Sequence, residues 1–449
     1  MATAAQTLAD FAVGLRFDQI PEQIVERAKD CIIDIAGVCA FGSTVPSSRP
    51  LLAYAEKYGQ GGGSTILGTA LKVHAPMAAL ANGAFAHSFE MDNLVAPSVG
   101  VHPGASLLPP GLAVAQEVGA PGRDFITAFV AGFEVMHRIG DAALEMTEKL
   151  GFHSPGLTGP FGGAVIAGRL LNLNAEQMTN ALGIAGSLSS GLLEFSKSGG
   201  GTVKRMHLGH GAQSGVMAAM LARDGFAGPA TVLEGKLGYL KAFARDADAS
   251  RLTAGLGEDW RTRRLLFKRY SCHITAHVPV TAILLLKSRY GVSGDDMAGV
   301  TVEGSEKMLS HHDIAEPRDV AMAQYSTPFC VAVACYLDPR NPNVFCEKTL
   351  NDGAIRDLCR RVKLKLREET TARNPLASRV TIRLKDGREL VEELESFPGM
   401  PQQPLDRAGL REKFETITAD LRQGRPATLF ASLTALERAP DVGALSWSF

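Results

Sequence analysis

The 449-residue sequence lacks the cysteine arrangement of a disulfide framework or of a cysteine-bound metal site. Its seven cysteines are odd in number, scattered, and never spaced as Cys-x-x-Cys. Reduced thiols therefore fit this chain better than disulfides, a zinc site or an iron–sulfur cluster. A His-x-x-x-His pair is present at His273 and His277, but no acidic third ligand lies near it in the sequence. We expect no metal.

An excess of charge of one sign is also missing. Lysine and arginine total 46 and aspartate and glutamate 47, and there is no extended basic face, RNA-type aromatic motif or zinc-finger spacing. We therefore expect no nucleic acid partner. The N-terminus lacks a basic segment followed by a long apolar core, and glycine or charge interrupts every long apolar run. We expect no membrane association and a cytoplasmic location.

What is present is the composition of a soluble globular protein, with 45% hydrophobic and 21% charged residues. Up to about residue 245, apolar residues recur at helical spacing in segments rich in Ala, Gly, Leu and Met. Such segments are typical of buried helices that pack closely. The predicted helices are Thr7–Gly14, Ile24–Val38, Ala75–Phe89, Ala105–Glu117, Arg123–Leu144, Gly159–Leu171, Ala175–Leu188 and His207–Asp224.

After about residue 265 the pattern changes to alternating apolar and polar residues. It predicts strands at 300–303, 362–366, 380–384 and 390–394, with a hairpin at Asp386-Gly387. Helices are expected at 278–290, 329–337 and 406–421. The fold class is therefore mainly α, with a large all-helical domain built from both chain ends and an inserted smaller α+β lid. The expected domains are residues 1–265, 266–397 and 398–449.

One polar stretch, from Asn82 to Ser106, joins two predicted helices through an irregular loop. It contains Glu90, Asp92 and His102 between almost wholly apolar flanks. Carboxylates and imidazoles against an apolar wall are typical of proton-transfer sites, because burial and mutual contact shift their pKa values toward neutrality. A surface loop in which Asp92 and Asn93 cap a helix is the alternative.

Four further polar clusters interrupt the helical scaffold. All but one lie at loop-to-helix joints, where backbone N–H groups and the positive helix end favour anions. The clusters are Gly151–Gly156 with His153, Thr202–His210 with Lys204 after the Gly-rich joint Lys197–Thr202, Phe267–His277 with Lys268 and His273, and Gln324–Cys330.

Several other histidines favour supporting or surface roles. His87 is expected to orient the loop by a hydrogen bond. His207, His210 and His277 are expected to pack or support other groups. The pair His311-His312 lies in a segment that looks exposed.

Five ordered motifs resemble the MmgE/PrpD family, and the resemblance covers essentially the whole chain. They are His87-Ser-x-Glu-x-Asp92, His102-Pro-Gly-Ala, Gly151-Phe-His153, Lys204-x-x-His207-x-Gly and Phe267-Lys-Arg-Tyr-x-x-His273. The family contains 2-methylcitrate dehydratase, cis-aconitate decarboxylase and iminodisuccinate epimerase. The resemblance implies a cofactor-free, homodimeric, mainly helical enzyme for small di- or tricarboxylates, with its site in a cleft between the helical domain and the lid.

The resemblance also implies roles for individual residues. The catalytic carboxylate of the family falls on Glu90 and the neighbouring carboxylate on Asp92. The remaining family positions fall on the loop histidines His102 and His153, the substrate-binding Lys204, and Lys268 and His273 at the domain junction.

The chain departs from the family pattern at several positions. Decarboxylase-like members have Asp where this chain has Glu90, Thr where it has Leu94 and Tyr where it has Phe329. The dehydratase stretch Asp-x-Asn-Asp-Thr-Trp and the Glu-Trp-Gly before its His-Pro are also absent. These differences leave the fold and general chemistry unchanged, but they do not allow one named activity to be transferred.

The residue types agree with chemistry α to a carboxylate. Such chemistry needs a base near neutral pKa and cations that stabilise the doubly charged intermediate. Lys204, Lys268 and Arg269 are expected to bind the carboxylates of a small polycarboxylate substrate.

Proton transfer is expected to involve two groups. His102 or His273 would abstract the α-proton, and His153 or the Glu90/Asp92 pair would protonate a departing hydroxyl. The sequence favours a 2-methylcitrate dehydratase-like hydro-lyase. The alternatives are an epimerase of a substituted succinate, a cis-aconitate decarboxylase-like enzyme, and a non-catalytic carboxylate-binding homologue, although a binder has no use for so many proton carriers.

Overall fold

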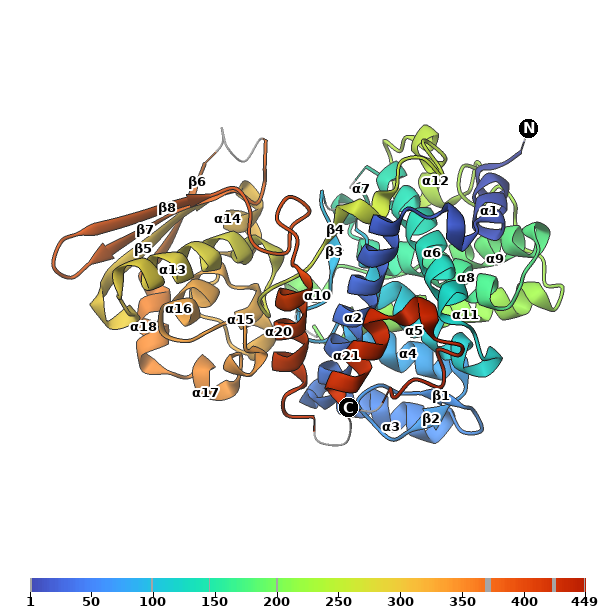
Figure 1. Cartoon of the computed structure of the whole chain (residues 1–449). Coiled ribbons are helices and arrows are strands. Elements are labelled where there is room, and N and C mark those ends of the chain that lie inside the picture. Colours follow the sequence, from blue (N-terminus) through green and yellow to red (C-terminus); the bar gives the residue numbers. More distant parts are fainter. Residues whose placement is uncertain are drawn as a thin grey trace. The chain divides into compact units, whose positions relative to one another are not determined.

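The computed structural model describes residues 2–97, 100–144, 146–198, 201–367, 373–421, 425–447 and 449. The chain divides into two compact units, coloured along the sequence in Figure 1. The first unit comprises Met1–Ser88, Asp92–Leu266 and Arg407–Phe449. The second comprises Phe89–Met91 and Phe267–Asp406. Helices far outnumber strands in the described residues, so the predicted mainly α class is confirmed.

The first unit consists mainly of helices, and all eight helices predicted before residue 245 are present. Most begin or end a few residues from their predicted bounds, and α2 continues six residues further, to Thr44. The helices are α1 Ala4–Gly14, α2 Glu22–Thr44, α3 Arg49–Tyr58, α4 Ala75–Ala86, α5 Pro103–Val118, α6 Gly122–Ala142, α7 Met146–Lys149, α8 Ser154–Leu170, α9 Ala175–Ser187, α10 Phe195–Ser198, α11 Val203–Arg223, α12 Tyr239–Phe243, α20 Arg407–Thr418 and α21 Pro426–Thr434.

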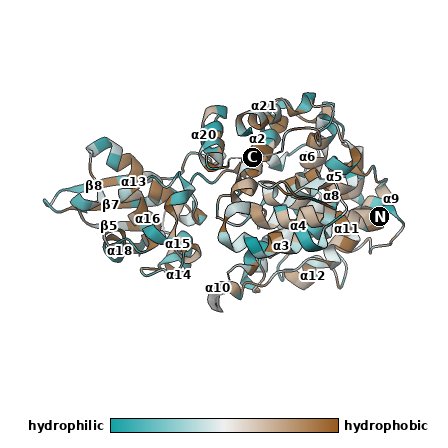
Figure 2. Ribbon diagram, turned by 90° about the horizontal axis from the view of Figure 1, so that it is seen from below, coloured by the Kyte–Doolittle hydropathy of each residue, from teal (hydrophilic) through white to brown (hydrophobic). Residues whose placement is uncertain are grey.

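Small residues let the central helices of this unit approach very closely. A Cβ atom added to Gly215 of α11 would lie 2.5 Å from the backbone of Gly163 in α8. A Cβ atom on Gly209 would lie 2.4 Å from the carbonyl oxygen of Leu80 in α4. Figure 2 shows mostly hydrophobic or neutral colour along α4, α5 and α8 and hydrophilic colour along α3 and α20. Tight backbone contact therefore replaces large interlocking side chains at these crossings.

Two short strand pairs fix loops of the first unit. β1 (Ser64–Thr65) pairs with β2 (Lys72–Val73), and β3 (Leu94–Val95) pairs antiparallel with β4 (Leu265–Leu266). Because β3 lies in the loop between α4 and α5, its pairing anchors the predicted polar stretch. Ser98 and Val99 of that stretch lie outside the described residues. So do Gly199 and Gly200 of the predicted Gly-rich joint.

The second unit contains a four-stranded sheet with the order β6-β5-β7-β8. The strands are β5 Met297–Gly304, β6 Val362–Leu366, β7 Ser378–Leu384 and β8 Glu389–Leu394. β5 pairs parallel with β6 and antiparallel with β7, and β7 pairs antiparallel with β8. The four predicted strands and the hairpin are confirmed, and Gly387 has the positive φ of 92° that its turn requires.

Helices of the second unit supply the rest of its apolar core. They are α13 His277–Tyr290, α14 Glu306–His312, α15 Val320–Tyr325, α16 Thr327–Tyr336, α17 Glu347–Leu350 and α18 Gly353–Arg360. Residues of α13 and α16 are buried together with the inward side chains of β5 and β7, such as Val302, Val380 and Ile382. The alternation read from the sequence therefore marks the buried face of the sheet.

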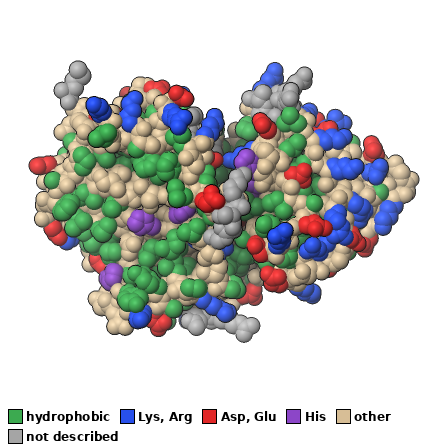
Figure 3. Space-filling model, turned by 180° about the vertical axis from the view of Figure 1, so that it is seen from behind, with side chains coloured by type: hydrophobic (Ala, Val, Ile, Leu, Met, Phe, Trp, Pro, Cys, Tyr) green, Lys and Arg blue, Asp and Glu red, His purple; other side chains and the backbone are tan. Residues whose placement is uncertain are grey.

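The length and apolar character of a helix decide whether it can cross a membrane. No single helix in the described ranges is long and apolar enough to cross a membrane. One pair of helices meets the length and composition of a membrane span when taken together, and by these criteria only. The pair is Glu22–Thr44 and Pro46–Tyr58, and it is bent by 84° at the break. On the face in Figure 3, hydrophobic atoms are prominent over the first unit and charged atoms over the second.

Candidate active site

Helix ends place the candidate residues of the first unit. His87 is the C-cap of α4, His102 the N-cap of α5, and His153 the N-cap of α8. Lys204 is the second residue of α11. Proline follows His102 directly and follows His153 after one residue, which favours helix initiation at both points. The expectation that His153 and Lys204 lie at loop-to-helix joints is confirmed.

Asp92 lies between two imidazoles. Its Oδ2 is 2.8 Å from Nδ1 of His87 and 2.7 Å from Nδ1 of His102. Burial alone would raise the pKa of the Asp92 carboxyl, but the adjacent His87 and His102 outweigh burial and lower this pKa well below its usual value. Asp92 is therefore an ionised acceptor, and each imidazole donates its Nδ1–H to it.

This arrangement fixes the tautomer of His102. With the proton on Nδ1, the other ring nitrogen, Nε2, carries the lone pair and can accept a proton. The His102 side chain is 15% exposed, whereas those of Asp92 and His87 are fully buried. His102 is therefore the member of this trio whose basic nitrogen can be reached from outside the protein interior.

The same three residues could also offer ligands to a cation. One atom from each of His87, Asp92 and His102 lies within 4.8 Å of the others. The contacts of 2.7 and 2.8 Å are hydrogen-bond lengths that use a proton on each Nδ1. A metal bound through these nitrogens would have to replace both protons.

A second imidazole pair follows in the same unit. Nδ1 of His153 lies 3.0 Å from Nδ1 of His207, and the His87 and His153 rings are 5.7 Å apart. Burial, followed by the charge of Lys204, lowers the pKa of His153 well below its usual value. Burial also lowers the pKa of His87 to about 4, although Asp92 opposes this change. Both imidazoles are therefore neutral at neutral pH. We call His87, Asp92, His102, His153, Lys204 and His207 the imidazole cluster.

The second unit holds a separate group of candidates built around Glu90. Oε2 of Glu90 lies 2.8 Å from Nζ of Lys268, and the two side chains are 7% and 2% exposed. The Tyr325 hydroxyl donates to the other oxygen, Oε1, at 3.1 Å. Glu90 has a φ of 55°, a left-handed conformation that is uncommon outside glycine and often marks functional positions.

His273 belongs to the same group. Its ring stacks on that of His312 with centroids 3.9 Å apart, and the Tyr325 ring lies 5.3 Å away. Burial, followed by the charge of His312, lowers the pKa of His273 well below its usual value. Nδ1 of His273 is 3.0 Å from Oγ1 of Thr275. We call Glu90, Lys268, His273, His312 and Tyr325 the lysine–carboxylate cluster.

Arg269 has different neighbours from Lys268. Its charge lowers the pKa of Asp338, after the effects of Arg340, and also acts on Tyr270. Its backbone N–H donates to Nε2 of His277 at 3.2 Å. The ammonium of Lys268 contacts the Glu90 carboxylate, so the two consecutive cations have different neighbours.

The structure thus brings the sequence-predicted residues together in two groups. His102, Asp92, His153 and Lys204 lie in the imidazole cluster, and Glu90, Lys268 and His273 lie in the lysine–carboxylate cluster. Glu90 belongs to the second unit although Ser88 and Asp92, close to it in the sequence, belong to the first. The polar stretch singled out in the sequence therefore contributes to both clusters.

Sequence reasoning was wrong about one histidine. The prediction that His311 and His312 are both exposed holds for His311 only, because His312 is 3% exposed. Its Nδ1–H donates to the carbonyl oxygen of Tyr325 at 2.9 Å. The ring faces inward because it stacks on the ring of His273, a contact that joins segments far apart in the sequence. Tyr325 was also missed, although the quoted segment Gln324–Cys330 contained it.

The capping alternative applies to Asn93. Its Oδ1 accepts from the backbone N–H of Gly104 in the first turn of α5 at 2.8 Å. Its Nδ2 donates to Asp34 at 2.9 Å. Asp92 instead bonds the two imidazoles, so the neighbouring side chains have different tasks.

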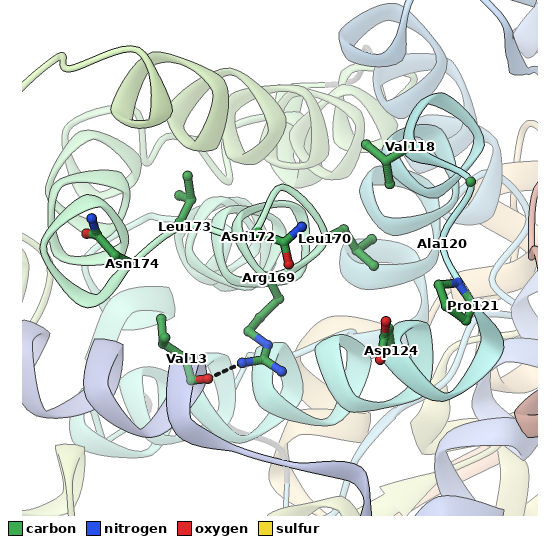
Figure 4. Close-up of a pocket in the computed structure, with 11 residues that line it drawn as sticks. Val13, Val118, Ala120, Pro121, Asp124, Arg169, Leu170, Asn172, Leu173 and Asn174 are labelled. Atoms are coloured by element: carbon green, nitrogen blue, oxygen red, sulfur yellow. Dashed lines mark hydrogen bonds between the residues drawn. The ribbon is translucent and has the colours of Figure 1, made fainter.

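A cavity of about 500 Å³ lies elsewhere in the first unit (Figure 4). Asp124, Arg169 and Asn172 line it together with apolar side chains. Arg169 donates to the carbonyl oxygens of Val13 and Leu15 and so ties α1 to α8. None of the sequence-predicted site residues lines this cavity.

Comparison with known proteins identifies the class to which this fold and these clusters belong. Residues 6–252 match the MmgE/PrpD N-terminal domain and residues 270–430 the MmgE/PrpD C-terminal domain. The chain belongs to the MmgE/PrpD family, as its motifs predict.

Individual relatives are named as decarboxylases. The chain is 28% identical to the cis-aconitate decarboxylase of Aspergillus terreus, over 98% of this chain and 94% of the relative. It is 25% identical to the cis-aconitate decarboxylase of Homo sapiens, over 92% of this chain and 87% of the relative. The enzyme of that name from Mus musculus is likewise 25% identical.

Proposed function

We propose that the protein is a cofactor-independent lyase for a small di- or tricarboxylate, and specifically a 2-methylcitrate dehydratase-like hydro-lyase. The observation that carries the proposal is the 2.7 Å contact between Nδ1 of His102 and Oδ2 of the buried Asp92. It supports a general base whose Nε2 lone pair is held in place and ready to accept a proton. Family membership and the decarboxylase relatives support the broader lyase class.

The proposed reaction starts with His102. Its Nε2 takes the proton from the carbon next to a substrate carboxylate, and the resulting imidazolium is stabilised by the ionised Asp92. The electron pair of the broken C–H bond then forms a C=C bond, and hydroxide leaves from the neighbouring carbon. We assign its proton to His153, so that water is released and atoms balance.

His207 has a supporting part in this proposal. When a protonated His207 donates its Nδ1–H to Nδ1 of His153 across the 3.0 Å contact, His153 carries its own proton on Nε2. His153 gives this Nε2 proton to the departing hydroxyl and takes the Nδ1 proton of His207, so both imidazoles end neutral and the released molecule is water. His207 lies on α11 and is half-buried, so it can exchange its proton more readily than the buried His153.

Substrate carboxylates need cations. In the imidazole cluster this role is assigned to Lys204, whose charge lowers the pKa of both His87 and His153. In the lysine–carboxylate cluster it is assigned to Lys268, whose ammonium Glu90 orients. Because a primary ammonium has three donors, we assign to Lys268 a contact with a substrate carboxylate in addition to its contact with Glu90.

Decarboxylation is the second candidate, favoured by the names of the relatives. A decarboxylase must give a proton to the carbanion that CO2 leaves behind. Phe329, where decarboxylase-like members have Tyr, lies in the apolar core of the second unit. We therefore place dehydration first.

Two other outcomes remain as alternatives. Reprotonation of the carbanion on its opposite face would make the protein an epimerase of a substituted succinate. A non-catalytic homologue would bind a polycarboxylate and exchange no proton. Neither outcome requires a different set of binding cations.

Proton NMR of the purified protein with citrate, 2-methylcitrate, cis-aconitate, malate-type acids and iminodisuccinate tests the proposal. We expect an olefinic product from a hydroxy acid. Itaconate from cis-aconitate would establish the decarboxylase instead. Inversion of a substituted succinate would establish the epimerase, and silence across the panel with thermal stabilisation by one acid would establish the binding protein.

We also propose that the protein is a homodimer, as the family resemblance implies. Sedimentation equilibrium would then give about twice the chain mass of 47.7 kDa. A mass of one chain across the concentrations tested would contradict this.

A further inference from the structure

Tyr325 makes a contact that no motif in the sequence indicated. Its hydroxyl donates to Oε1 of Glu90 at 3.1 Å, while Lys268 contacts Oε2 at 2.8 Å. We propose that Tyr325 is a positioning residue of the active site, which holds the Glu90 carboxylate so that Lys268 presents its ammonium to a substrate carboxylate. This inference rests on the proposed function, because it deepens the role given there to Lys268.

The Glu90 carboxylate needs a second contact to keep one orientation. A carboxylate bonded to one lysine can rotate about that contact, whereas a donor on each oxygen fixes the plane of the group. Glu90 lies in a loop outside the regular helices and strands, in the left-handed region at φ 55°. The hydroxyl of Tyr325 restrains the plane of its carboxylate.

Tyr325 is itself fixed at several points. Its carbonyl oxygen accepts from Nδ1–H of His312, and its ring lies 5.3 Å from the ring of His273 and 5.9 Å from that of His312. It is the last residue of α15, so the helix determines where its side chain starts. The hydroxyl is therefore carried by a restrained ring.

The preceding residue connects the same segments. The Nε2 amide of Gln324 donates to the carbonyl oxygens of Phe89 and Ser271, both at 3.0 Å. The backbone carbonyl oxygen of Gln324 accepts from the backbone N–H of His273 at 2.8 Å. Gln324 thus fixes the residue before Glu90 and the segment that carries His273, and Tyr325 fixes the Glu90 carboxylate.

A purely space-filling role would not need the hydroxyl. Tyr325→Phe keeps the ring and removes the donor to Glu90, so it separates the two roles. Tyr270→Phe is the matched control, because Tyr270 is also buried in the second unit. Its hydroxyl forms a hydrogen bond of 3.1 Å with Oγ1 of Thr281, whereas the Tyr325 hydroxyl bonds Glu90.

The first test uses the full-length protein and calorimetric binding of tricarballylate, a tricarboxylate without a hydroxyl that cannot be dehydrated. We expect Tyr325→Phe to weaken binding about tenfold, as for loss of one hydrogen bond to a charged group, and Tyr270→Phe to leave it unchanged. In a Glu90→Gln background, Tyr325→Phe should add no further loss. Equal affinity of Tyr325→Phe and the unaltered protein, or independent effects in the double variant, would overturn the inference.

The second test separates this inference from the proposed function. With the hydroxy acid that is turned over, Tyr325→Phe should raise KM about tenfold and change kcat little, with the melting temperature close to that of Tyr270→Phe. If no acid is turned over but tricarballylate binding falls in Tyr325→Phe as expected, the hydro-lyase proposal fails and the positioning role stands. If turnover is normal and neither binding nor KM changes, the positioning role fails alone. Failure of the unaltered protein to bind tricarballylate would also overturn it.

Discussion

One carboxylate oxygen, Oδ2 of Asp92, accepts hydrogen bonds from the Nδ1 atoms of two imidazoles. The same oxygen therefore sets the tautomer of His102 and orients the buried His87. An asparagine at this position would offer an N–H donor as well as an oxygen acceptor. Its N–H would need an imidazole whose Nδ1 carries no proton, which is the opposite of the tautomer that Asp92 holds. The carboxylate is needed for its charge and for its accepting oxygen.

Asp92→Asn tests this role at the residue scale. We expect kcat to fall about 10²- to 10⁴-fold with a KM changed by only a few-fold, because binding groups remain while the base loses its tautomer. Steady-state kinetics with the acid that is turned over provides the measurement. Asp141→Asn, which alters a carboxylate paired with Arg251, is the control. Activity of Asp92→Asn within threefold of the unaltered protein would contradict the assignment.

His137 gives a prediction about stability. It is fully buried in α6, and burial, followed by the charges of nearby arginines, lowers its pKa to about 3. An unfolded chain takes up this proton near pH 6.5. Between pH 6.5 and 3 the unfolded state therefore binds more protons, and stability falls as the pH falls, by up to about 1.4 kcal/mol per pH unit.

His137→Leu should remove this contribution. Urea unfolding of the variant between pH 7 and 5 should show a shallower loss of stability than the unaltered protein, whatever its absolute stability at pH 7. Thr127→Val, at a buried residue of the same helix that has no titratable side chain, should leave the slope unchanged. Equal slopes for His137→Leu and the unaltered protein would refute the prediction.

At the scale of helices and strands, helix ends and helix crossings determine where the clusters form. Patterns of 3.6 and 2 residues predicted the helices and strands because each element buries one continuous face. Contacts such as Tyr325 with Glu90 join residues 235 positions apart, and no local pattern records them. His312 was misassigned for the same reason, because its burial depends on the ring of His273 rather than on its own segment.

Lys204 in the first turn of α11 gives an element-scale prediction. Its charge lowers the pKa of His87 and His153, so its removal should raise both. Lys204→Met should therefore increase KM and raise the pH at which the His153 imidazole takes up a proton, which proton NMR of the histidine ring signals measures. Lys241→Met, at an exposed lysine of α12, is the control. An unchanged His153 titration would contradict the effect assigned to the Lys204 charge.

The crossing of α4 and α11 gives a second prediction at the scale of helices. A Cβ atom at Gly209 would lie 2.4 Å from the Leu80 carbonyl oxygen, so Gly209→Ala must separate the helices and should cost about 1–3 kcal/mol. Gly14→Ala, where no atom lies within 4 Å, should not lower the melting temperature. Thermal unfolding followed by circular dichroism measures both. A Gly209→Ala variant as stable as the unaltered protein would show that the crossing can yield at no cost.

At the scale of the whole molecule, the chain belongs to the MmgE/PrpD family, and its ordered motifs were sufficient to identify it. They were also sufficient to find Asp92, His102 and Lys268, because these residues stand within the motifs. The reaction was not determined by the same means. Dehydration, epimerisation and decarboxylation all begin from a base, two or more cations and a polycarboxylate, and they differ in where one proton goes.

Solvent deuterium exchange is the most direct measurement of the central claim that His102, oriented by Asp92, removes a proton α to a carboxylate. The acid that is turned over is incubated in D2O and the proton signal of its α-carbon is followed by NMR. The account predicts that the unaltered protein exchanges this proton, that Asp92→Asn slows the exchange, and that His102→Gln abolishes it while tricarballylate still binds. Undiminished exchange in His102→Gln, with substrate bound, would contradict the account.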